Sequence, residues 1–430
     1  MARILIVGGS LGGLMAANML LKDGHDVRVL EKVRGSMDGR GAGIVTHDAL
    51  TEGLKRAGLD DSESLGVAID GRMSLNHDGS VGIEIDMPQV LTSWSRLYHL
   101  LHRLVPAERY LQGVSVERVE QLADRVVVHA LDGEQRTTFE ADVVVASDGI
   151  RSAMRQQFAP QIQPVYAGYV AWRGVCEESV LSNLTLNTVF DTFGFCLPVG
   201  EQIIGYPVAG PGNDTRRGRR AYNFVWYRPA PAGPALDALL TDADGVHHPG
   251  GISPNKVSWQ HVSDMRQDAR RILAPQFAEM IEKTAQPFLQ PIYDLASTQI
   301  AFDRVALMGD ASFVGRPHIG MGVTKAAEDA TALADAIRSH GATAEALRVY
   351  EQQRLPQCQM AVDRARWLGA YMQSQAAGQA SQTHAHTTER NAREVVAETA
   401  IDLGRYGHVT AFRPTPAPTQ QHAGAKHAEH

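Results

Sequence analysis

The chain has 430 residues, 44% of them hydrophobic, so its length suits two or three structural units and its composition supplies a large core. Its 41 basic against 48 acidic residues give a net charge of −7, which excludes the polycationic surface that nucleic acids or anionic membranes require. The three cysteines are widely spaced, and neither a run of 18 apolar residues nor a signal-peptide core is found. We therefore expect a cytoplasmic globular protein with free thiols, without a metal site and without a nucleic-acid or membrane partner.

The first 35 residues follow the pattern strand, glycine turn, helix, strand. An apolar run over residues 3–7 precedes a glycine-rich turn over residues 8–13, an amphipathic helix continues to Lys22, and a β-branched run begins at Val27. A helix that links two such strands makes them parallel neighbours. The sequence therefore predicts a doubly wound α/β sheet.

Further elements follow along the chain. The first group comprises a helix ending at Ala57-Gly58, a helix from Leu91 to Leu104, a hairpin from Val114 to Phe139 with its turn at residues 131–133, and a buried strand at 143–146. Short β-rich runs separated by Pro and Gly occupy about 160–300. The last group comprises a buried strand from Arg304 to Met308, a helix from Val323 to Arg338, and a helical region from Ala344 to about Gln375 with a kink or break at Pro356.

The turn between the first strand and the first helix has the features of a dinucleotide site. Gly8 and Gly13 would let backbone N–H groups approach a pyrophosphate at the helix N-terminus, while Ser10 replaces the middle glycine of the usual fingerprint. Glu31 lies 18 residues after Gly13, at the end of the second strand, where its carboxylate would accept hydrogen bonds from ribose hydroxyls. A purely structural glycine turn is the alternative.

Two pairs made of one Asp and one Gly also close strands. Asp148-Gly149 follows one strand, and Gly309-Asp310 follows another. Each alone is a common turn. In this order, and followed by the helix that opens at Gly322, they would place a carboxylate at a ribityl hydroxyl and a helix N-terminus at the edge of an anionic reduced flavin ring.

These three motifs, with a β-rich region between the second and the third, resemble the class A flavoprotein monooxygenases of the aromatic-hydroxylase type over about residues 1–375. Segments 166–174, 223–227 and 316–318 resemble in particular the branch that hydroxylates dihydroxypyridines. The resemblance implies a Rossmann-like FAD-binding domain (1–158 and 300–375), interleaved with a mainly antiparallel β-sheet substrate domain (159–299). A C-terminal helical segment and a disordered tail would fill 376–430.

The resemblance also implies FAD as cofactor, NAD(P)H as reductant and O2 as co-substrate. It assigns cofactor binding to residues of the three motifs and to some of their neighbours: Gly8, Ser10, Leu11, Gly13, Glu31, Lys32, Arg40, Val116, Asp148, Gly309, Asp310, Gly320, Met321 and Gly322. A solvated surface position is the alternative for Arg40. The chain departs from the family pattern at Trp94, Phe313 and Thr324, where Arg, His and Asn are usual.

In such enzymes a flavin C4a-hydroperoxide transfers an electrophilic oxygen to an electron-rich ring. Removing a proton from a ring hydroxyl makes the ring more nucleophilic, and a neutral imidazole can accept that proton near neutral pH. His318, which follows Pro317 in the loop expected beside the flavin, is therefore the candidate base. A histidine that only orients a backbone carbonyl is the alternative.

Four more residues are candidates for the substrate pocket: His47, Phe193, Cys196 and Tyr206. For His47, an exposed helix-cap histidine is the favoured interpretation. Core packing accounts equally well for the other three. His384 and His386 lack a third ligand in a fixed frame, so no metal site is expected there.

The sequence thus predicts an NAD(P)H- and O2-dependent hydroxylase of a small, electron-rich, N-heterocyclic aromatic ring. A homodimer is compatible with the sequence. Three alternatives stay open. One is a hydroxylase of a urate-like purine ring, and another is an FAD-dependent oxidase or reductase without hydroxylation. The third is a catalytically silent flavin-binding protein, which the departures at Ser10, Trp94 and Phe313 motivate.

Overall fold

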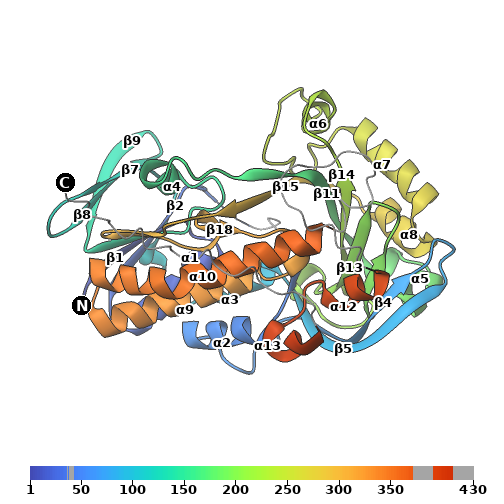
Figure 1. Ribbon diagram of the computed structural model, residues 1–430, viewed down its shortest axis with the longest axis horizontal. Coiled ribbons are helices and arrows are strands. Elements are labelled where there is room, and N and C mark those ends of the chain that lie inside the picture. The colour runs from blue at the N-terminus through green and yellow to red at the C-terminus, as the bar shows by residue number, and fades with distance from the viewer. Residues whose placement is uncertain (36, 38–42, 371–390, 410–430) are drawn as a thin grey trace, which may run out of the picture.

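The computed structural model describes residues 1–35, 37, 43–370 and 391–409. Its strands form a six-stranded, a nine-stranded and a three-stranded sheet, and long helices lie along the first of these (Figure 1). The predicted α/β class, with a Rossmann-like sheet, a mainly antiparallel sheet and C-terminal helices, is confirmed. Within the described ranges, no helix is long and apolar enough to cross a membrane.

The six-stranded sheet is the parallel sheet that the βαβ pattern predicts. All its neighbours pair in parallel except the antiparallel β16 and β17. The strand order is β16 (Ala301–Phe302), β17 (Val305–Leu307), β10 (Val143–Ala146), β1 (Arg3–Val7), β2 (Asp26–Glu31) and β6 (Tyr110–Gln112). The sheet is built from buried apolar runs, as parallel sheets covered on both faces require.

Three long helices accompany this sheet. The helix α1 (Leu11–Lys22) packs against α9 (Gly322–His340), which in turn packs against α10 (Ala344–Gly369) (Figure 1). The predicted break at Pro356 is wrong, because α10 continues through this residue, whereas a kink there stays a prediction. The proline removes one backbone donor, while buried residues on both sides, such as Tyr350 and Val362, hold the helix against the core.

The three-stranded sheet replaces the single hairpin predicted from Val114 to Phe139. It contains β7 (Val114–Gln121), β8 (Val126–Asp132) and β9 (Gln135–Ala141), all antiparallel. The predicted turn at residues 131–133 lies close to the second of two tight connections, between Asp132 and Gln135. The first connection was missed because it contains no glycine or proline.

The nine-stranded sheet is antiparallel except between β12 and β4. Its order is β18 (Phe313–Val314), β15 (Phe288–Ala296), β11 (Val165–Glu177), β14 (Ala221–Pro229), β13 (Gln202–Val208), β12 (Phe193–Cys196), β4 (Val67–Leu75), β5 (Val81–Ser93) and β3 (Gly43–Val45). The strands β3 to β5 thus come from a stretch that the predicted boundary at residue 158 places in the first domain. That boundary stays a prediction.

The remaining helices are shorter: α2 (Asp48–Ala57), α3 (Trp94–His102), α4 (Ala153–Phe158), α5 (Asn183–Thr188), α6 (Pro234–Leu239), α7 (Trp259–Ile272), α8 (Pro275–Lys283), α12 (Ala392–Glu398) and α13 (Leu403–Tyr406). The predicted start of a helix at Leu91 is wrong, because residues 91–93 continue β5. Ser93 instead caps α3, since its hydroxyl accepts a hydrogen bond from the N–H of Arg96 at 3.1 Å.

Candidate functional site

The glycine turn connects the end of β1 to the start of α1. Gly8 has a φ of +100°, and a Cβ at this position would lie 2.3 Å from the carbonyl oxygen of Ser147. A Cβ at Gly13 would lie 2.0 Å from the carbonyl oxygen of Gly8. Both positions therefore require glycine. Ser10 occupies the N-cap of α1, where Leu11 is buried, and the Ser10 side chain makes no capping bond, so the first-turn N–H groups favour an anion at this end.

Glu31 fixes the shape of this turn. Its carboxylate is buried and accepts one hydrogen bond from the N–H of Gly9 and one from the N–H of Val33, each at 2.8 Å. An ionised carboxylate offers about four acceptor positions, so two such bonds leave capacity for ribose hydroxyls. The residue predicted to recognise a ribose therefore also holds the glycine turn against β2.

A pocket of about 380 Å³ opens beside the turn. Six of the predicted cofactor residues line it: Gly8, Ser10, Glu31, Lys32, Val116 and Asp148. Sequence reasoning missed other lining residues, among them Met37, Val114 and Ser115, because no motif marks them. Trp94, one of the departures from the family pattern, also lines the pocket and stacks on Tyr98 with ring centroids 4.9 Å apart.

Asp148 contributes an acceptor atom to this pocket. Its Oδ2 accepts a hydrogen bond from the N–H of Ala153 at 2.8 Å, while its buried Oδ1 has no hydrogen-bond partner within the described part of the chain. Burial raises the pKa of this carboxyl. An acceptor left unpaired in a pocket beside a glycine turn fits a dinucleotide that supplies hydroxyl or amine donors.

The Gly309-Asp310 turn follows β17 and lies on a buried polar network that the sequence did not reveal. Asp329 of α9 is the centre of the network. Its Oδ2 accepts a hydrogen bond from the N–H of Gly309 at 3.0 Å, and Lys325 donates to the carbonyl oxygen of Gly309 at 2.9 Å and to Asp329 at 3.1 Å. Both polar groups of Gly309 are therefore held by α9, and the Asp310 side chain is exposed beyond them.

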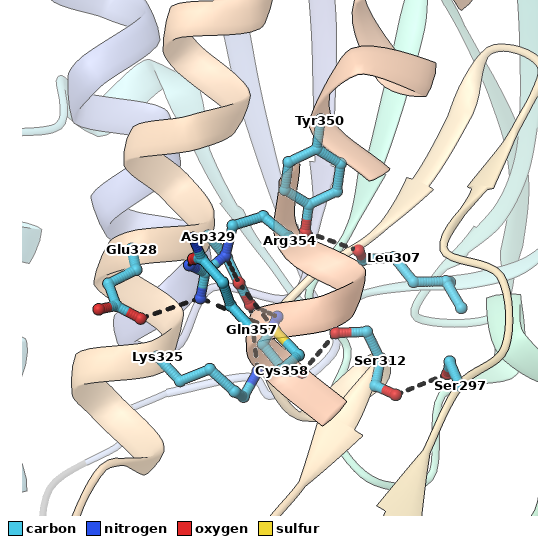
Figure 2. A network of polar contacts seen from close by, with 11 residues as sticks. Ser297, Leu307, Ser312, Lys325, Glu328, Asp329, Tyr350, Arg354, Gln357 and Cys358 are labelled. Atoms are coloured by element: carbon cyan, nitrogen blue, oxygen red, sulfur yellow. Dashed lines mark hydrogen bonds and ion pairs between the residues drawn. The ribbon is translucent and has the colours of Figure 1, made fainter. Parts of the chain in front are cut away.

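The helix α10 completes the network from the other side. Arg354 donates to Asp329 Oδ1 at 2.7 Å and to Glu328 at 3.0 Å (Figure 2). Burial opposes ionisation of Asp329, but Lys325 and Arg354 outweigh it and hold the pKa of this carboxyl below its ordinary value. The cluster is a charged core that fixes where Asp310 is presented.

Arg155 joins the two Asp-Gly motifs. This buried side chain donates from Nη1 to the carbonyl oxygen of Ala311 at 2.9 Å and from Nη2 to the carbonyl oxygen of Ile150 at 2.5 Å. The turn after β10 and the turn after β17 are therefore held at a fixed separation. This role of Arg155 depends on contacts with two segments that are far apart in sequence, so only the fold reveals it.

The third glycine segment leads into α9. Gly320 has a φ of +66° and ends the 3₁₀ turn η5 (Pro317–Ile319), Met321 is the N-cap, and Gly322 is the first helical residue. A Cβ at Gly322 would meet nothing within 4 Å, so the space before this helix end is open to a ligand. The predicted residue Arg40 and the pair His384 and His386 lie outside the described residues.

His318 lies in η5, next to Pro317, and is only 1% exposed. Its Nε2 lies 3.0 Å from the hydroxyl oxygen of Tyr169, and its ring centroid is 4.2 Å from that of Tyr227. Burial raises the pKa of Tyr169, so that phenol stays protonated and can donate to the imidazole. The structure therefore embeds the candidate base in an aromatic wall formed by β11 and β14.

His47 is not the exposed helix-cap histidine that the sequence favoured. It occupies the N-cap position of α2, but its ring is 3% exposed, makes no capping bond, and its Nδ1 lies 2.8 Å from the Thr324 hydroxyl at the start of α9. Burial lowers the pKa of His47 to about 4, so the ring is neutral near pH 7. This contact joins the start of α2 to the first turn of α9, the helix predicted to face the flavin.

The remaining three candidates divide between the two faces of the nine-stranded sheet, because successive side chains of a strand point to opposite sides. Phe193 and Tyr206 pack in one apolar cluster together with Tyr169, with their own ring centroids 4.9 Å apart. Burial raises the pKa of Tyr206 to about 12. Cys196 belongs to the opposite cluster, against α7 and α8, which fits the core packing that the sequence left open for it.

Comparison with known proteins decides the family. A family model described as an FAD binding domain matches residues 1–193 and 252–365. The chain is 31% identical to 2,6-dihydroxypyridine 3-monooxygenase from Paenarthrobacter nicotinovorans over 83% of this chain and 87% of that protein. The chain belongs to the class A FAD-dependent aromatic monooxygenases.

Two further relatives support this membership. The solved structure of 2,6-dihydroxypyridine-3-hydroxylase from Arthrobacter nicotinovorans superimposes with a TM-score of 0.81 at 28% identity, covering 89% of this chain and 95% of that chain. An FAD-dependent urate hydroxylase from Klebsiella pneumoniae is 28% identical over 85% of this chain and 88% of that protein. FAD is therefore the cofactor of this enzyme, and the glycine turn, the pocket and the unpaired Asp148 oxygen fit it.

Proposed function

We propose that this monooxygenase uses NAD(P)H and O2 to hydroxylate a small, electron-rich, hydroxylated N-heterocyclic ring. The observation that carries the proposal is the buried pair of His318 and Tyr169 in an aromatic wall. A flat aromatic substrate is the ligand that such a wall favours. The dihydroxypyridine and urate relatives, whose names both describe heteroaromatic substrates, support this class.

Bound FAD would carry electrons from NAD(P)H to O2. Gly8 and Gly13 would leave room for its pyrophosphate at the N-terminus of α1, Glu31 would accept hydrogen bonds from its ribose, and Asp310 would accept one from its ribityl chain. The open N-terminus of α9 at Gly322 would face the flavin ring and favour negative charge there.

His318 would take up the proton of the substrate hydroxyl. Its Nε2 already accepts from the Tyr169 hydroxyl in the tautomer that leaves this nitrogen unprotonated. A substrate proton therefore reaches Nε2 either directly or through Tyr169, which gives up its own proton as it receives the new one. The surrounding apolar residues, including Phe193 and Tyr206, would exclude water from the ionised substrate ring.

We also propose the interleaved division of the chain, with residues 1–158 and 300–375 serving FAD and residues 159–299 serving the substrate. The order of the six-stranded sheet supports it, since β16 and β17 return to the side of β10 after the long β-rich insertion.

We propose a cytoplasmic location as well. Support comes from the three cysteines Cys176, Cys196 and Cys358, which are all buried free thiols.

The test is a screen of hydroxypyridines, hydroxynicotinates, phenols and urate with the FAD-loaded protein. We expect hydroxypyridines to stimulate NADH or NADPH oxidation and to yield a product with one added oxygen. If only urate does so, the substrate is the purine-like alternative. Oxidation that produces hydrogen peroxide with every compound and no oxygenated product would identify an oxidase and refute the proposal.

A further inference from the structure

A segment near the C-terminus lies across the nine-stranded sheet, beyond the residues that the FAD-binding family model matches. Residues 391–402, here called the strap, comprise α12 and the turn after it, whereas the family match ends at residue 365. Asn391 and Glu394 form a capping box that starts α12. The strap contacts β4 and β5 (Figure 1).

Arg72 of β4 binds the strap through its guanidinium group. The side chain is 1% exposed and donates hydrogen bonds to the carbonyl oxygens of Val396 at 2.8 Å, Thr399 at 2.5 Å and Ala400 at 3.1 Å. Gln89 of β5 orients the guanidinium by accepting from Nη2 at 2.7 Å. A buried arginine that is paired with backbone carbonyls fixes a chain segment at a defined position, because each lost bond would leave a buried charge less compensated.

Ala400 passes this restraint on to the candidate base. Its φ is +50°, a conformation that a residue with a side chain rarely adopts. In this conformation its carbonyl oxygen accepts from Arg72, while its N–H donates to the carbonyl oxygen of His318 at 2.8 Å. The backbone of His318 is therefore tied to Arg72 through a single residue of the strap.

The strap also meets the second histidine and the aromatic wall. Asp402, at its end, accepts a hydrogen bond from the N–H of Asp48 at 2.6 Å, directly after His47. Val395, Val396 and Ala400 belong to the same buried cluster as Phe193 and Tyr206. Residues 391–402 thus supply part of the apolar surroundings of the candidate substrate site and hold both of its histidine-bearing segments.

We propose that Arg72 and the strap form a positioning and specificity element that sets the place of His318 relative to the substrate ring. This inference rests on the proposed function, because it assumes that a heteroaromatic substrate meets His318. Arg72 is a positioning residue that acts through Ala400. Its loss should impair substrate use while leaving the FAD pocket beside β1 intact.

The test compares full-length, FAD-loaded Arg72→Gln and Ala400→Val variants with the wild type, using 2,6-dihydroxypyridine as probe. We expect the KM for the probe to rise about tenfold and the product formed per NAD(P)H to fall several-fold, since small displacements of a reacting group are costly. The dissociation constant for FAD should stay within about twofold of wild type. Arg393→Gln is the matched control, because Arg393 is an exposed residue of α12 in the strap, and it should behave as wild type.

Ala400→Val covers the case in which Arg72→Gln does not fold, since it strains the strap without removing the buried cation. Unchanged KM and coupling in a folded variant would overturn the inference, and so would loss of FAD affinity in proportion to loss of turnover, which indicates general loosening. A wild type that neither oxidises NAD(P)H in response to the probe nor oxygenates any compound of the screen refutes the proposed function itself. A wild type that works, with variants that match it, refutes only the role of the strap.

Discussion

At the scale of single residues, His318 carries the proposed proton transfer. Replacing it by Gln keeps a side chain that can hydrogen-bond Tyr169 but cannot take up a proton at neutral pH. We expect His318→Gln to lower the rate of hydroxylation about 10²-fold or more, with FAD affinity nearly unchanged. Single-turnover rates and FAD titration measure the two quantities, and wild-type oxygenation by the variant would contradict the assignment.

The buried ring of His47 leads to a separate prediction, on how the free energy of unfolding depends on pH. Its pKa is about 4 in the folded chain against 6.5 for an ordinary histidine, mainly because the ring is buried, although Asp402 and Asp48 oppose the shift. A depressed folded-state pKa gives stability that is complete above pH 6.5 and is lost as pH falls from 6.5 towards 4, by about 3 kcal/mol in total. Urea unfolding of wild type and His47→Asn should therefore show a shallower loss of stability in the variant below pH 6.5. Parallel pH profiles would refute the shift.

Residue by residue, the sequence predicted best where a motif restricts the backbone. Gly8 and Gly13 could be found because a strand, a turn and a helix follow each other without interruption, and Glu31 because its spacing from them is fixed by one helix. His47 was misread because its burial comes from Thr324 and the strap, both far away in sequence. For Cys196 the sequence left pocket and core open, because the face on which a strand residue lies depends on strand register.

At the scale of elements, the pair α9 and α10 positions the Gly309-Asp310 turn through Asp329. Asp329→Asn leaves Lys325 and Arg354 buried with less compensation. We expect it to lower the free energy of unfolding by about 3 kcal/mol and to weaken FAD binding several-fold. Asp335→Asn on the same helix is the control, because the Asp335 side chain is half exposed and exposed pairs contribute less than about 1 kcal/mol. Equal effects of both substitutions would contradict a positioning role for the network.

The elements themselves were predicted unevenly. Among helices with strong periodicity or clear caps, α9 was expected close to its true bounds and α2 close to its true end. The strands β4 and β5 were missed, although Val67, Ile69, Met73 and Leu75 recur at every second position apart from Gly71. The burial of Arg72, at a position that the pattern would leave to solvent, has a reason that only the fold reveals, because Arg72 holds the strap.

At the scale of the whole molecule, the chain makes its six-stranded sheet from both ends of the sequence and inserts most of the nine-stranded sheet between them. The return of a buried strand at residues 305–307 made this interleaving predictable. The contribution of residues 43–93 to the second sheet was not predictable, because sheet pairing between distant segments leaves no local signal. His47 and His318 are each held by segments from distant parts of the chain, His47 by Thr324 of α9 and His318 by Ala400 of the strap.

The central claim is that this enzyme inserts one oxygen atom from O2 into a hydroxylated heteroaromatic ring. It is tested most directly by turnover of the preferred hydroxypyridine with NAD(P)H under ¹⁸O-labelled O2, followed by mass spectrometry of the product. We predict a product that contains a single labelled oxygen atom, formed only when FAD is bound. An unlabelled product, or consumption of O2 that yields hydrogen peroxide alone, would contradict it.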